Sequence, residues 1–560
     1  MAKRSTGEAE LVFVPLGGVG EIGMNLSLYG FGPAKERKWL MVDLGITFAS
    51  EFDEPGVDII LPDIAFIERE KRNLLGIIIT HAHEDHFGGL IDLWPRLNCP
   101  LYMTPFAAGL LEAKLDAEPM KSQIPITRFK AGDRIELAPF SVEAIAVAHS
   151  IPESTALAIS TPVGTVVHTG DWKIDETPVL GWATDLKRLG ELGDAGVLAL
   201  VCDSTNVVRE GISPSERDVA ATLTRLIAEA PARVAVTTFA SNIARVRAVA
   251  DAAKSCGRSV VVLGRAMRRA IDVATELGMF EGVPEFLDDE AYGYLPREKV
   301  VALMTGSQGE SRAALAKVAS GEHRNIALSP DDIVIFSSRT IPGNETAVGT
   351  VVNGLAKQGA SIVTDRDALV HVSGHPRRGE LAQMYQAVKP RIAIPVHGER
   401  LHLATHARFA RAQGVPDVIE TQNGKIVRLG PGVPGVIGEV PVGRIFRDGR
   451  LIVAPEKSGV KERRKAGFAG VVVASLVLDE RGNQAVESDV VSIGVPEADA
   501  NGVLFDDIAI TAIDNCLKSL SAQKRRDHDL VADAVTRSIR AAINERWGKK
   551  PIVEVLIAEV

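Results

Sequence analysis

The segment HAHEDH at residues 81–86 limits the possible folds of this chain more than any other feature. It directly follows an apolar run that ends Ile78-Ile79-Thr80, and five of its six side chains are ionisable, a density that packing does not require. His81 and His83 would project the same way from an extended chain, whereas Asp85 and His86, at the start of the next turn, can face a second point. Imidazole and carboxylate donors at this spacing suit two metal ions a few ångströms apart. We therefore expect a metal site at the end of a buried strand.

One loop cannot supply every ligand of two ions, so further ligands are expected at other strand ends. His149 follows the apolar run EAIAVA, Asp171 follows VVHTG and His397 follows IAIPV. Singly, each could be a buried histidine or a turn aspartate. Together, at the carboxyl ends of apolar strands where α/β folds place their sites, they form a constellation. Asp171 is the natural carboxylate to bridge two ions.

The spacing of apolar runs indicates an insertion within a larger domain. Short apolar strands fill residues 11–205, and strands alternate with helices from 213 to 338. The pattern of short apolar strands returns after about residue 360. Ser213 and Glu216 are typical of a helix N-cap and its capping box. The predicted organisation is a first domain in two parts (1–210 and 363–445), an insertion (211–362), a linker (446–460) and a C-terminal α/β domain (461–560).

The C-terminal domain is predicted to contain a hairpin in GVVVASLVLDERGN, a helical region over 504–547 and a last strand, PIVEVLIAEV. Its two apolar strands offer more surface than one helix layer covers, so we expect it to pair with another surface. The alternative is a self-contained appendage on a Gly/Pro-rich linker. The basic run at 457–465 is interpreted as a solvated linker face, with RNA contact as the minor alternative.

Composition sets the broad class. With 560 residues, 46% hydrophobic and 24% charged, the chain is globular and too long for a single core. A formal charge of −9 means that any nucleic-acid binding requires a local basic groove. The four cysteines form no C-x-x-C pair, which favours a reducing compartment. The first eight residues hold no apolar leader, and no run reaches the ~18 apolar residues of a membrane span, so we expect a cytoplasmic protein without membrane contact.

The ligand pattern resembles a known superfamily. HAHEDH with Asp43, His149 and Asp171 is similar to the metallo-β-lactamase signature. Asp203 in CDSTN, His375 in SGHP and His397 in PVHGE resemble motifs A, B and C of its nucleic-acid-processing branch, called β-CASP.

Further segments narrow the resemblance to bacterial ribonuclease J: LGGVGEIGMN near the start, GSQGE (306–310), SSRTIPGNE (337–345) and HVSGH (371–375). The resemblance covers the chain to about residue 455 and the tail more loosely. It implies an α/β fold, with a metallo-β-lactamase αββα sandwich, an inserted parallel-sheet β-CASP domain and a small α/β C-terminal domain.

The resemblance also implies two Zn²⁺ per chain, with Mn²⁺ or Mg²⁺ as alternative activating ions. One ion would be held by His81, His83 and His149, the other by Asp85, His86 and His397, with Asp171 as the bridge. Asp43 would orient a ligand. His375 would meet the scissile phosphate, as electrostatic stabiliser or leaving-group acid, with Asp203 supporting the catalytic site.

Two groups of residues are predicted to contact substrate. The tight stretch His371, Val372, Ser373, Gly374 and His375 offers hydroxyl, backbone N–H and imidazole donors, which suits a phosphate cradle, and in the family it contacts RNA. A second group, in loops of the insertion, is a candidate pocket for a terminal 5′ phosphate: Ser307, Gln308, Ser337, Ser338 and Arg339. For these loops, ordinary turn chemistry is an equally weighted alternative.

The resulting hypothesis is a metal-dependent ribonuclease acting on single-stranded RNA as a homodimer or homotetramer. It would be a 5′-to-3′ exonuclease that prefers 5′-monophosphate ends and also an endonuclease, in rRNA maturation and mRNA decay. A small-molecule hydrolase, such as a thioesterase or lactamase, is disfavoured by the insertion and by SGHP and PVHGE. A non-catalytic RNA-binding scaffold is disfavoured because every ligand position is filled. DNA-repair and pre-mRNA-cleavage relatives are disfavoured by GGVGEIG and by the C-terminal domain.

Overall fold

The structure is a computed structural model that describes residues 8–50, 52–118, 123–341 and 343–560. The first seven residues, within which the sequence predicts no leader, lie outside the described residues. The chain divides into two compact units, one formed by Met1–Thr47 and Leu61–Gly443, the other by Phe48–Ile60 and Arg444–Val560. Each is described by itself.

Two facing sheets form the centre of the first unit. The first has the order β24-β23-β1-β3-β4-β7-β8-β9, with bounds Gly435–Glu439, Lys425–Gly430, Glu10–Gly17, Leu26–Gly32, Lys38–Val42, Leu74–Ile78, Leu101–Met103 and Ile126–Arg128. The second has the order β10-β11-β12-β13-β14-β20-β22, with bounds Arg134–Leu137, Phe140–Ala146, Thr155–Thr161, Gly164–His168, Val197–Asp203, Ile392–Val396 and Asp417–Val418. Two short strands, β2 (Val19–Gly20) and β21 (Gly398–Glu399), pair separately.

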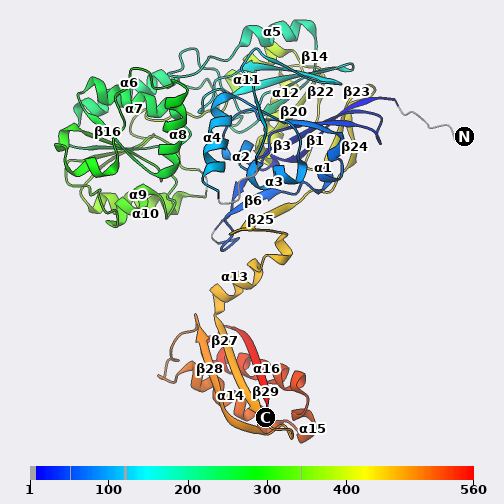
Figure 1. Cartoon of the computed structure of the whole chain (residues 1–560), viewed down its shortest axis with the longest axis vertical. Coiled ribbons are helices and arrows are strands. Elements are labelled where there is room, and N and C mark those ends of the chain that lie inside the picture. The colour runs from blue at the N-terminus through cyan, green and yellow to red at the C-terminus, as the bar shows by residue number, and fades with distance from the viewer. Residues whose placement is uncertain (1–7, 51, 119–122, 342) are drawn as a thin grey trace, which may run out of the picture. The chain divides into compact units, whose positions relative to one another are not determined.

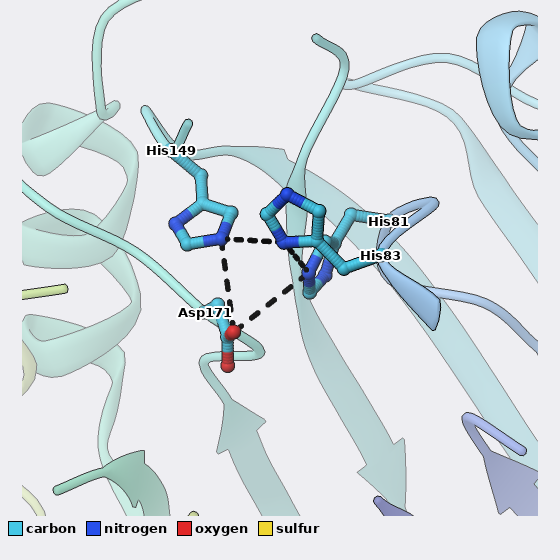
Figure 2. Close-up of side chains that lie close together, drawn as sticks. All are labelled: His81, His83, His149 and Asp171. Carbon is cyan, nitrogen blue, oxygen red and sulfur yellow. Dashed lines mark hydrogen bonds and ion pairs between the residues drawn. The ribbon is translucent and has the colours of Figure 1, made fainter. Parts of the chain in front are cut away.

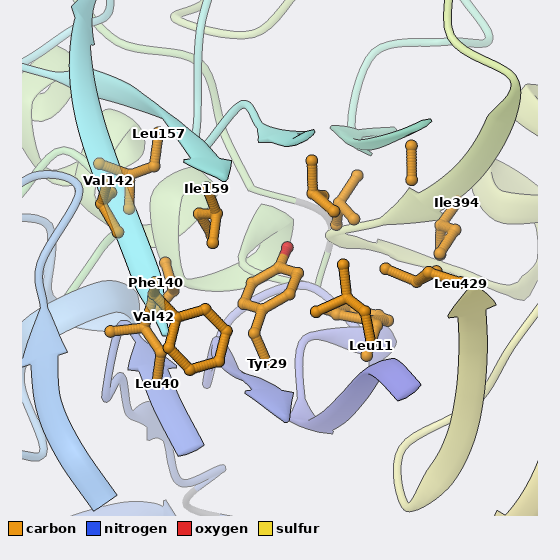
Figure 3. Close-up of a cluster of buried hydrophobic side chains, with 14 of the residues drawn as sticks. Leu11, Tyr29, Leu40, Val42, Phe140, Val142, Leu157, Ile159, Ile394 and Leu429 are labelled. Atoms are coloured by element: carbon orange, nitrogen blue, oxygen red, sulfur yellow. The ribbon is translucent and has the colours of Figure 1, made fainter. Parts of the chain in front are cut away.

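Apolar side chains from both sheets fill the space between them (Figure 3). Tyr29 and Leu40 come from the first sheet, and Leu157, Ile159 and Ile394 from the second. Strands such as β1 are buried along nearly their whole length, because helices cover the outer faces. On the second sheet this cover comes from α5 (Leu186–Ala195), α11 (Arg378–Val388) and α12 (Arg400–Ala412). We call the two sheets and their covering helices the body. Its remaining α-helices are α1 (Ala65–Arg69), α2 (Glu84–Phe87), α3 (Leu90–Leu97) and α4 (Pro105–Asp116).

The insertion leaves after β14 and returns before β20. Its five strands are all parallel, in the order β16-β17-β15-β18-β19, with bounds Ser259–Leu263, Val300–Met304, Val234–Thr237, Ile333–Phe336 and Ser361–Val363. Helices α9 (Ala314–Ser320) and α10 (Glu345–Lys357) lie together on one side of this sheet (Figure 1). Helices α6 (Glu216–Glu229) and α7 (Ile243–Ser255) also lie together, and α8 (Arg265–Glu276) connects β16 to β17.

The predicted start of α6 is wrong by two residues. Ser215, not Ser213, is the N-cap, and Asp218, not Glu216, completes the capping box. Glu216 is instead buried and paired with Arg245 of α7. A capping pattern describes one helix alone, so it cannot reveal that a distant arginine binds the acidic residue.

The second unit contains a three-stranded sheet, β28-β27-β29, with bounds Gln484–Ile493, Val471–Leu478 and Ile552–Glu559. The predicted hairpin is formed by β27 and β28, with β27 and the turn inside the predicted segment and β28 beginning directly after it at Gln484. The last strand pairs parallel to β27. The predicted helical region is three helices, α14 (Phe505–Ser519), α15 (Ala522–Arg525) and α16 (His528–Trp547). Apolar residues of α14 and α16 cover one face of the sheet.

The remaining elements of the second unit precede this sheet. Strands β25 (Arg444–Asp448) and β26 (Leu451–Val453) form a hairpin, and β5 (Thr47–Phe48) and β6 (Ile59–Pro62) flank the segment 48–60. The basic run forms part of the exposed helix α13 (Val460–Ala469). None of the described helices has the length and apolar character needed to cross a bilayer. The predicted fold class, an αββα sandwich with a parallel-sheet insertion and a C-terminal α/β domain, is confirmed.

Candidate metal centre

The predicted ligands gather at the carboxyl ends of strands. Strand β7 ends at Ile78, His81 and His83 follow on extended chain, and α2 begins at Glu84, as the spacing predicted. His149 and Asp171 follow β11 and β13 after two residues each, and His397 comes directly after β20. Strand ends of both sheets therefore deliver these side chains to one place.

The first donor set consists of His81, His83, His149 and Asp171 (Figure 2). Nδ1 of His83 lies 3.1 Å from Nε2 of His81 and 3.1 Å from Nε2 of His149. Both of those Nε2 atoms are 3.7 Å from Oδ2 of Asp171. Four donor atoms thus converge on one point, with three nitrogens and one oxygen, a set that suits zinc.

The second donor set consists of Asp85, His86, Asp171 and His397. Oδ2 of Asp171 is 3.2 Å from Nε2 of His86 and 3.5 Å from Nε2 of His397, and Oδ2 of Asp85 is 3.8 Å from the latter. Asp171 belongs to both sets. Its Oδ1 atom is buried without a hydrogen-bond donor, which is costly unless a cation binds the carboxylate. The donor atoms present therefore fit two adjacent metal ions.

Burial keeps the imidazoles of the first set neutral. It lowers the pKa of His81 and of His149 well below the usual value, and it lowers the pKa of His83 to about 4. A neutral imidazole keeps a lone pair for a metal, so these side chains are prepared to bind without first losing a proton.

In the second set, carboxylates and imidazoles stabilise each other's charged forms. Burial opposes charge on His86, but Asp171, Asp85 and Asp43 together raise its pKa well above the usual value. Burial likewise opposes charge on Asp171, yet His397 and His86 hold its pKa well below the usual value. The electric field at this point therefore favours a cation, which is what a metal ion would supply.

Two contacts orient ligand rings. Oδ2 of Asp43 lies 2.7 Å from Nδ1 of His86, and the backbone N–H and hydroxyl of Thr80 also donate to Asp43. On the other side, Nδ1 of His149 donates to the carbonyl of Gly374 at 2.7 Å. Both contacts leave Nε2 facing Asp171, which is the arrangement expected of partners that hold metal-binding histidines.

Asn25 belongs to this centre although the motif analysis did not select it as a site residue. Its Nδ2 atom lies 3.0 Å from Nε2 of His86 and 3.3 Å from Oδ2 of Asp85, and its Oδ1 accepts from Nδ1 of His397 at 2.9 Å. It thus joins three residues of the second set. The only signal in the sequence is its place at the end of LGGVGEIGMN, which carried the family resemblance but no chemistry of its own.

His375 and Asp203 form a pair beside the ligands. Nδ1 of His375 is 2.7 Å from Oδ2 of Asp203 and 3.9 Å from Oδ2 of Asp171. Burial opposes charge on His375, but Asp203 and Asp171 raise its pKa to about 9. Asn206, also unselected, donates to the hydroxyl of Ser373 and to the carbonyl of His375. The pair therefore presents a protonated imidazole next to the two donor sets.

The remaining predicted substrate residues lie where the insertion meets the body. Residues 371–375 form neither helix nor strand, with Val372 buried and His371 half-buried. The hydroxyl of Ser337 donates to the carbonyl of Val370, so the end of β18 touches the start of this segment.

Three of the other four residues of the candidate phosphate pocket, Ser307, Gln308 and Arg339, are joined by hydrogen bonds. Gln308 donates to the hydroxyl of Ser307 and to the carbonyl of Arg339, and Arg339 pairs with Asp365. Ser307, Gln308 and Ser338 are buried.

Comparisons with known proteins identify the family and its domains. Residues 31–265 match the metallo-beta-lactamase superfamily and 359–419 the Zn-dependent metallo-hydrolase RNA specificity domain. Residues 231–355 match the ribonuclease J beta-CASP domain, and 458–560 the ribonuclease J C-terminal domain. Ribonuclease J of Sinorhizobium meliloti is 56% identical over 99% of this chain and 98% of its own length. The chain belongs to the ribonuclease J family.

More distant relatives are also similar over nearly the whole chain. Ribonuclease J of Mycolicibacterium smegmatis is 38% identical, covering 97% of this chain and 96% of its own length. A crystal structure of a protein of unknown function from Enterococcus faecalis matches with a TM-score of 0.53 and 16% identity, covering 75% of this chain and all of that one. That structural likeness supports the fold alone. Membership of the ribonuclease J family thus rests on sequence similarity across both units.

Proposed function

We propose that this protein is a metal-dependent ribonuclease that hydrolyses RNA phosphodiester bonds with two metal ions, Zn²⁺ in the first instance and Mn²⁺ or Mg²⁺ as alternatives. The observation that carries the proposal is the pair of donor sets that share Asp171, with His375 held 3.9 Å from that carboxylate. Bound metals would supply a nucleophile at neutral pH and positive charge for the phosphate oxygens. Family membership supports RNA as the substrate.

The protein's own groups would place the substrate and move a proton. His375 is protonated at neutral pH, because Asp203 stabilises its positive charge against burial. The imidazolium can therefore donate a hydrogen bond to a non-bridging oxygen, or a proton to the departing 3′ oxygen. Asp203 fixes the ring through Nδ1, which leaves Nε2 to face the phosphate. The backbone of 371–375 would bind the neighbouring phosphate.

The finer specificity in our proposal is for single-stranded RNA, degraded 5′-to-3′ from a 5′-monophosphate end and also cut internally. The contact of Ser337 with Val370, directly before the 371–375 segment, supports it, because a phosphate bound at the end of β18 would lie close to the segment that carries His375. Roles in rRNA maturation and mRNA decay would follow from such an activity.

The decisive experiment compares 5′-monophosphate and 5′-triphosphate versions of one RNA, each uniformly labelled. We expect mononucleotides to accumulate from the monophosphate RNA, with slower loss of the triphosphate RNA because the larger group fits poorly. Equal rates and equal processivity on both would contradict the end preference. An absence of cleavage of either RNA by the metal-loaded protein would contradict the ribonuclease function itself.

We also propose a homodimer or homotetramer. One face of the C-terminal sheet is uncovered within its own unit, with Val486, Val491, Ile493 and Leu556 each more than half exposed. An apolar sheet face of this kind usually marks an interaction site. A cytoplasmic location is proposed because all four cysteines are unpaired.

A further inference from the structure

Arg245, on helix α7 of the insertion, is fully buried and binds both the insertion and the body. Its Nη2 atom lies 2.8 Å from Oε2 of Glu216. Its Nη1 atom donates to the hydroxyl of Ser337 at 2.6 Å, to the carbonyl of Ser337 at 2.9 Å and to the carbonyl of Val370 at 3.0 Å. One guanidinium thus joins α6, the end of β18 and the start of the catalytic segment 370–375.

The acidic partner of Arg245 is connected to the metal centre. Oε1 of Glu216 lies 3.9 Å from the ammonium of Lys173, and that ammonium is 3.0 Å from Asp175. Asp175 in turn accepts from the backbone N–H of Glu216. Lys173 is two residues after the shared ligand Asp171, and a cavity of about 10 Å³ is lined by Lys173, Glu216 and the ligand His149. Arg245, Glu216, Lys173 and Asp175, the four charged groups of this network, are all buried.

Side chains, not secondary structure, hold the segment 370–375 in place. His149 binds the carbonyl of Gly374, and Asn206 binds Ser373 and the carbonyl of His375. At its start, the carbonyl of Val370 accepts from Arg245 and from Ser337. Arg245 and Ser337 therefore form the anchor that the insertion contributes to this segment.

A buried guanidinium is expensive unless its donors are satisfied. Arg245 meets that condition through contacts on three separate elements, which a point charge such as a lysine ammonium cannot reproduce. A simple link between α6 and α7 would need only the pair with Glu216. The bonds to Ser337 and Val370 direct the residue toward the catalytic segment.

We propose that Arg245, paired with Glu216, is a positioning residue that fixes the segment 370–375 so that His375 faces the metal centre. This inference rests on the ribonuclease function proposed above. It assigns the insertion a role in the chemical step, because the insertion holds the start of the segment that carries His375.

The test compares Arg245→Lys with a matched control, Arg258→Lys. Arg258 is a buried arginine of the same insertion that binds the carbonyls of Ala230 and Ala232, inside the insertion. Each variant is assayed on 5′-monophosphate RNA and on bis(p-nitrophenyl) phosphate. The p-nitrophenolate group leaves readily without an acid, so hydrolysis of the small ester does not require proton donation by His375, whereas departure of an RNA 3′ oxygen does. The comparison therefore tests the placement of His375 as the leaving-group acid.

We expect Arg245→Lys to keep the wild-type metal content and to lose at least about tenfold in kcat on RNA, because small misplacements at a reacting centre cost up to about 10²-fold. Hydrolysis of the small ester should stay within about threefold of wild type. Arg258→Lys should lower Tm without changing the ratio of the two activities.

Hydrogen exchange at residues 370–375 gives a second readout that does not depend on RNA cleavage. Exchange there should rise in Arg245→Lys and not in Arg258→Lys. Equal losses on both substrates, or unchanged exchange in this segment, would overturn the positioning role. If the wild-type protein fails to cleave RNA, the proposed function is wrong, and the exchange measurement still decides the role of Arg245.

Discussion

Replacing Gly374 by alanine should weaken metal binding by displacing the ring of His149. A Cβ atom at this position would lie 2.6 Å from Nδ1 and from Cε1 of the His149 ring, and 2.9 Å from the hydroxyl of Ser150. The backbone of Gly374 is not in the left-handed region, so alanine can adopt its conformation without strain. The effect must therefore arise from the displaced imidazole.

The size of the effect follows from that distance. To reach ordinary van der Waals contact at 3.4 Å, the ring must retreat by about 0.8 Å. Metal–nitrogen distances tolerate only about 0.2 Å of change, so the movement exceeds what the bond can absorb. It also disturbs the 2.7 Å hydrogen bond from Nδ1 of His149 to the Gly374 carbonyl. Loss of such an orienting partner typically costs about 10–100-fold in metal affinity, or about 1.4–2.7 kcal/mol.

The assay is competition for zinc with a chromophoric chelator, with metal content per chain measured after dialysis. Gly190→Ala is the matched control, because a Cβ there meets nothing within 4 Å and Gly190 lies inside helix α5 of the same body. We expect the control to bind zinc as wild type does and the Gly374 variant to release one ion more readily. Unchanged affinity in Gly374→Ala would show that the 371–375 segment does not hold His149.

Other changes to the site and the assembly lead to distinct outcomes. His81→Ala or Asp171→Ala should lose metal and abolish hydrolysis, whereas His375→Ala should keep both ions and lose most of the rate; metal analysis beside RNA cleavage separates the two. Asp203→Asn removes the charge that raises the pKa of His375 to about 9, so the alkaline limb of kcat should move to lower pH, and an unmoved limb would exclude His375 as the acid. Truncation after Gly443 should give a smaller oligomer by light scattering with both metals retained; an unchanged oligomer would place the subunit contacts in the catalytic body.

The fold could be predicted because its signals are local. Buried strands, Gly-bounded turns and the change from strand runs to alternating strands and helices each occupy a short stretch of sequence. The start of α6 shows the limit, since Ser213 and Ser215 both precede an acidic residue at a suitable spacing. The choice between them depends on Arg245 and Asp175, which bind Glu216 and its backbone from other elements.

The site was predictable where its residues carry strong chemistry. Imidazoles and carboxylates at strand ends stand out, since they cost free energy there unless a ligand compensates them. Asn25 and Asn206 do not, because an asparagine in a loop is common turn chemistry. Their contacts join residues far apart in the chain, as when Asn25 meets His397. Only the folded arrangement reveals such partners.

The point of insertion explains how the site is assembled from such distant segments. Strands β14 and β20 are parallel neighbours, with Asp203 beside Val396 in the register, yet they are separated by the whole insertion. Because adjacent parallel strands end at the same edge, Asp203 and His397 meet there regardless of the length between them. The chain must then return from the insertion to that edge before β20, and residues 370–375 make the return. His375 therefore reaches Asp203 through the same connection that the insertion anchors at Val370, so the position of the His375 imidazole depends on how the insertion is held against this connection.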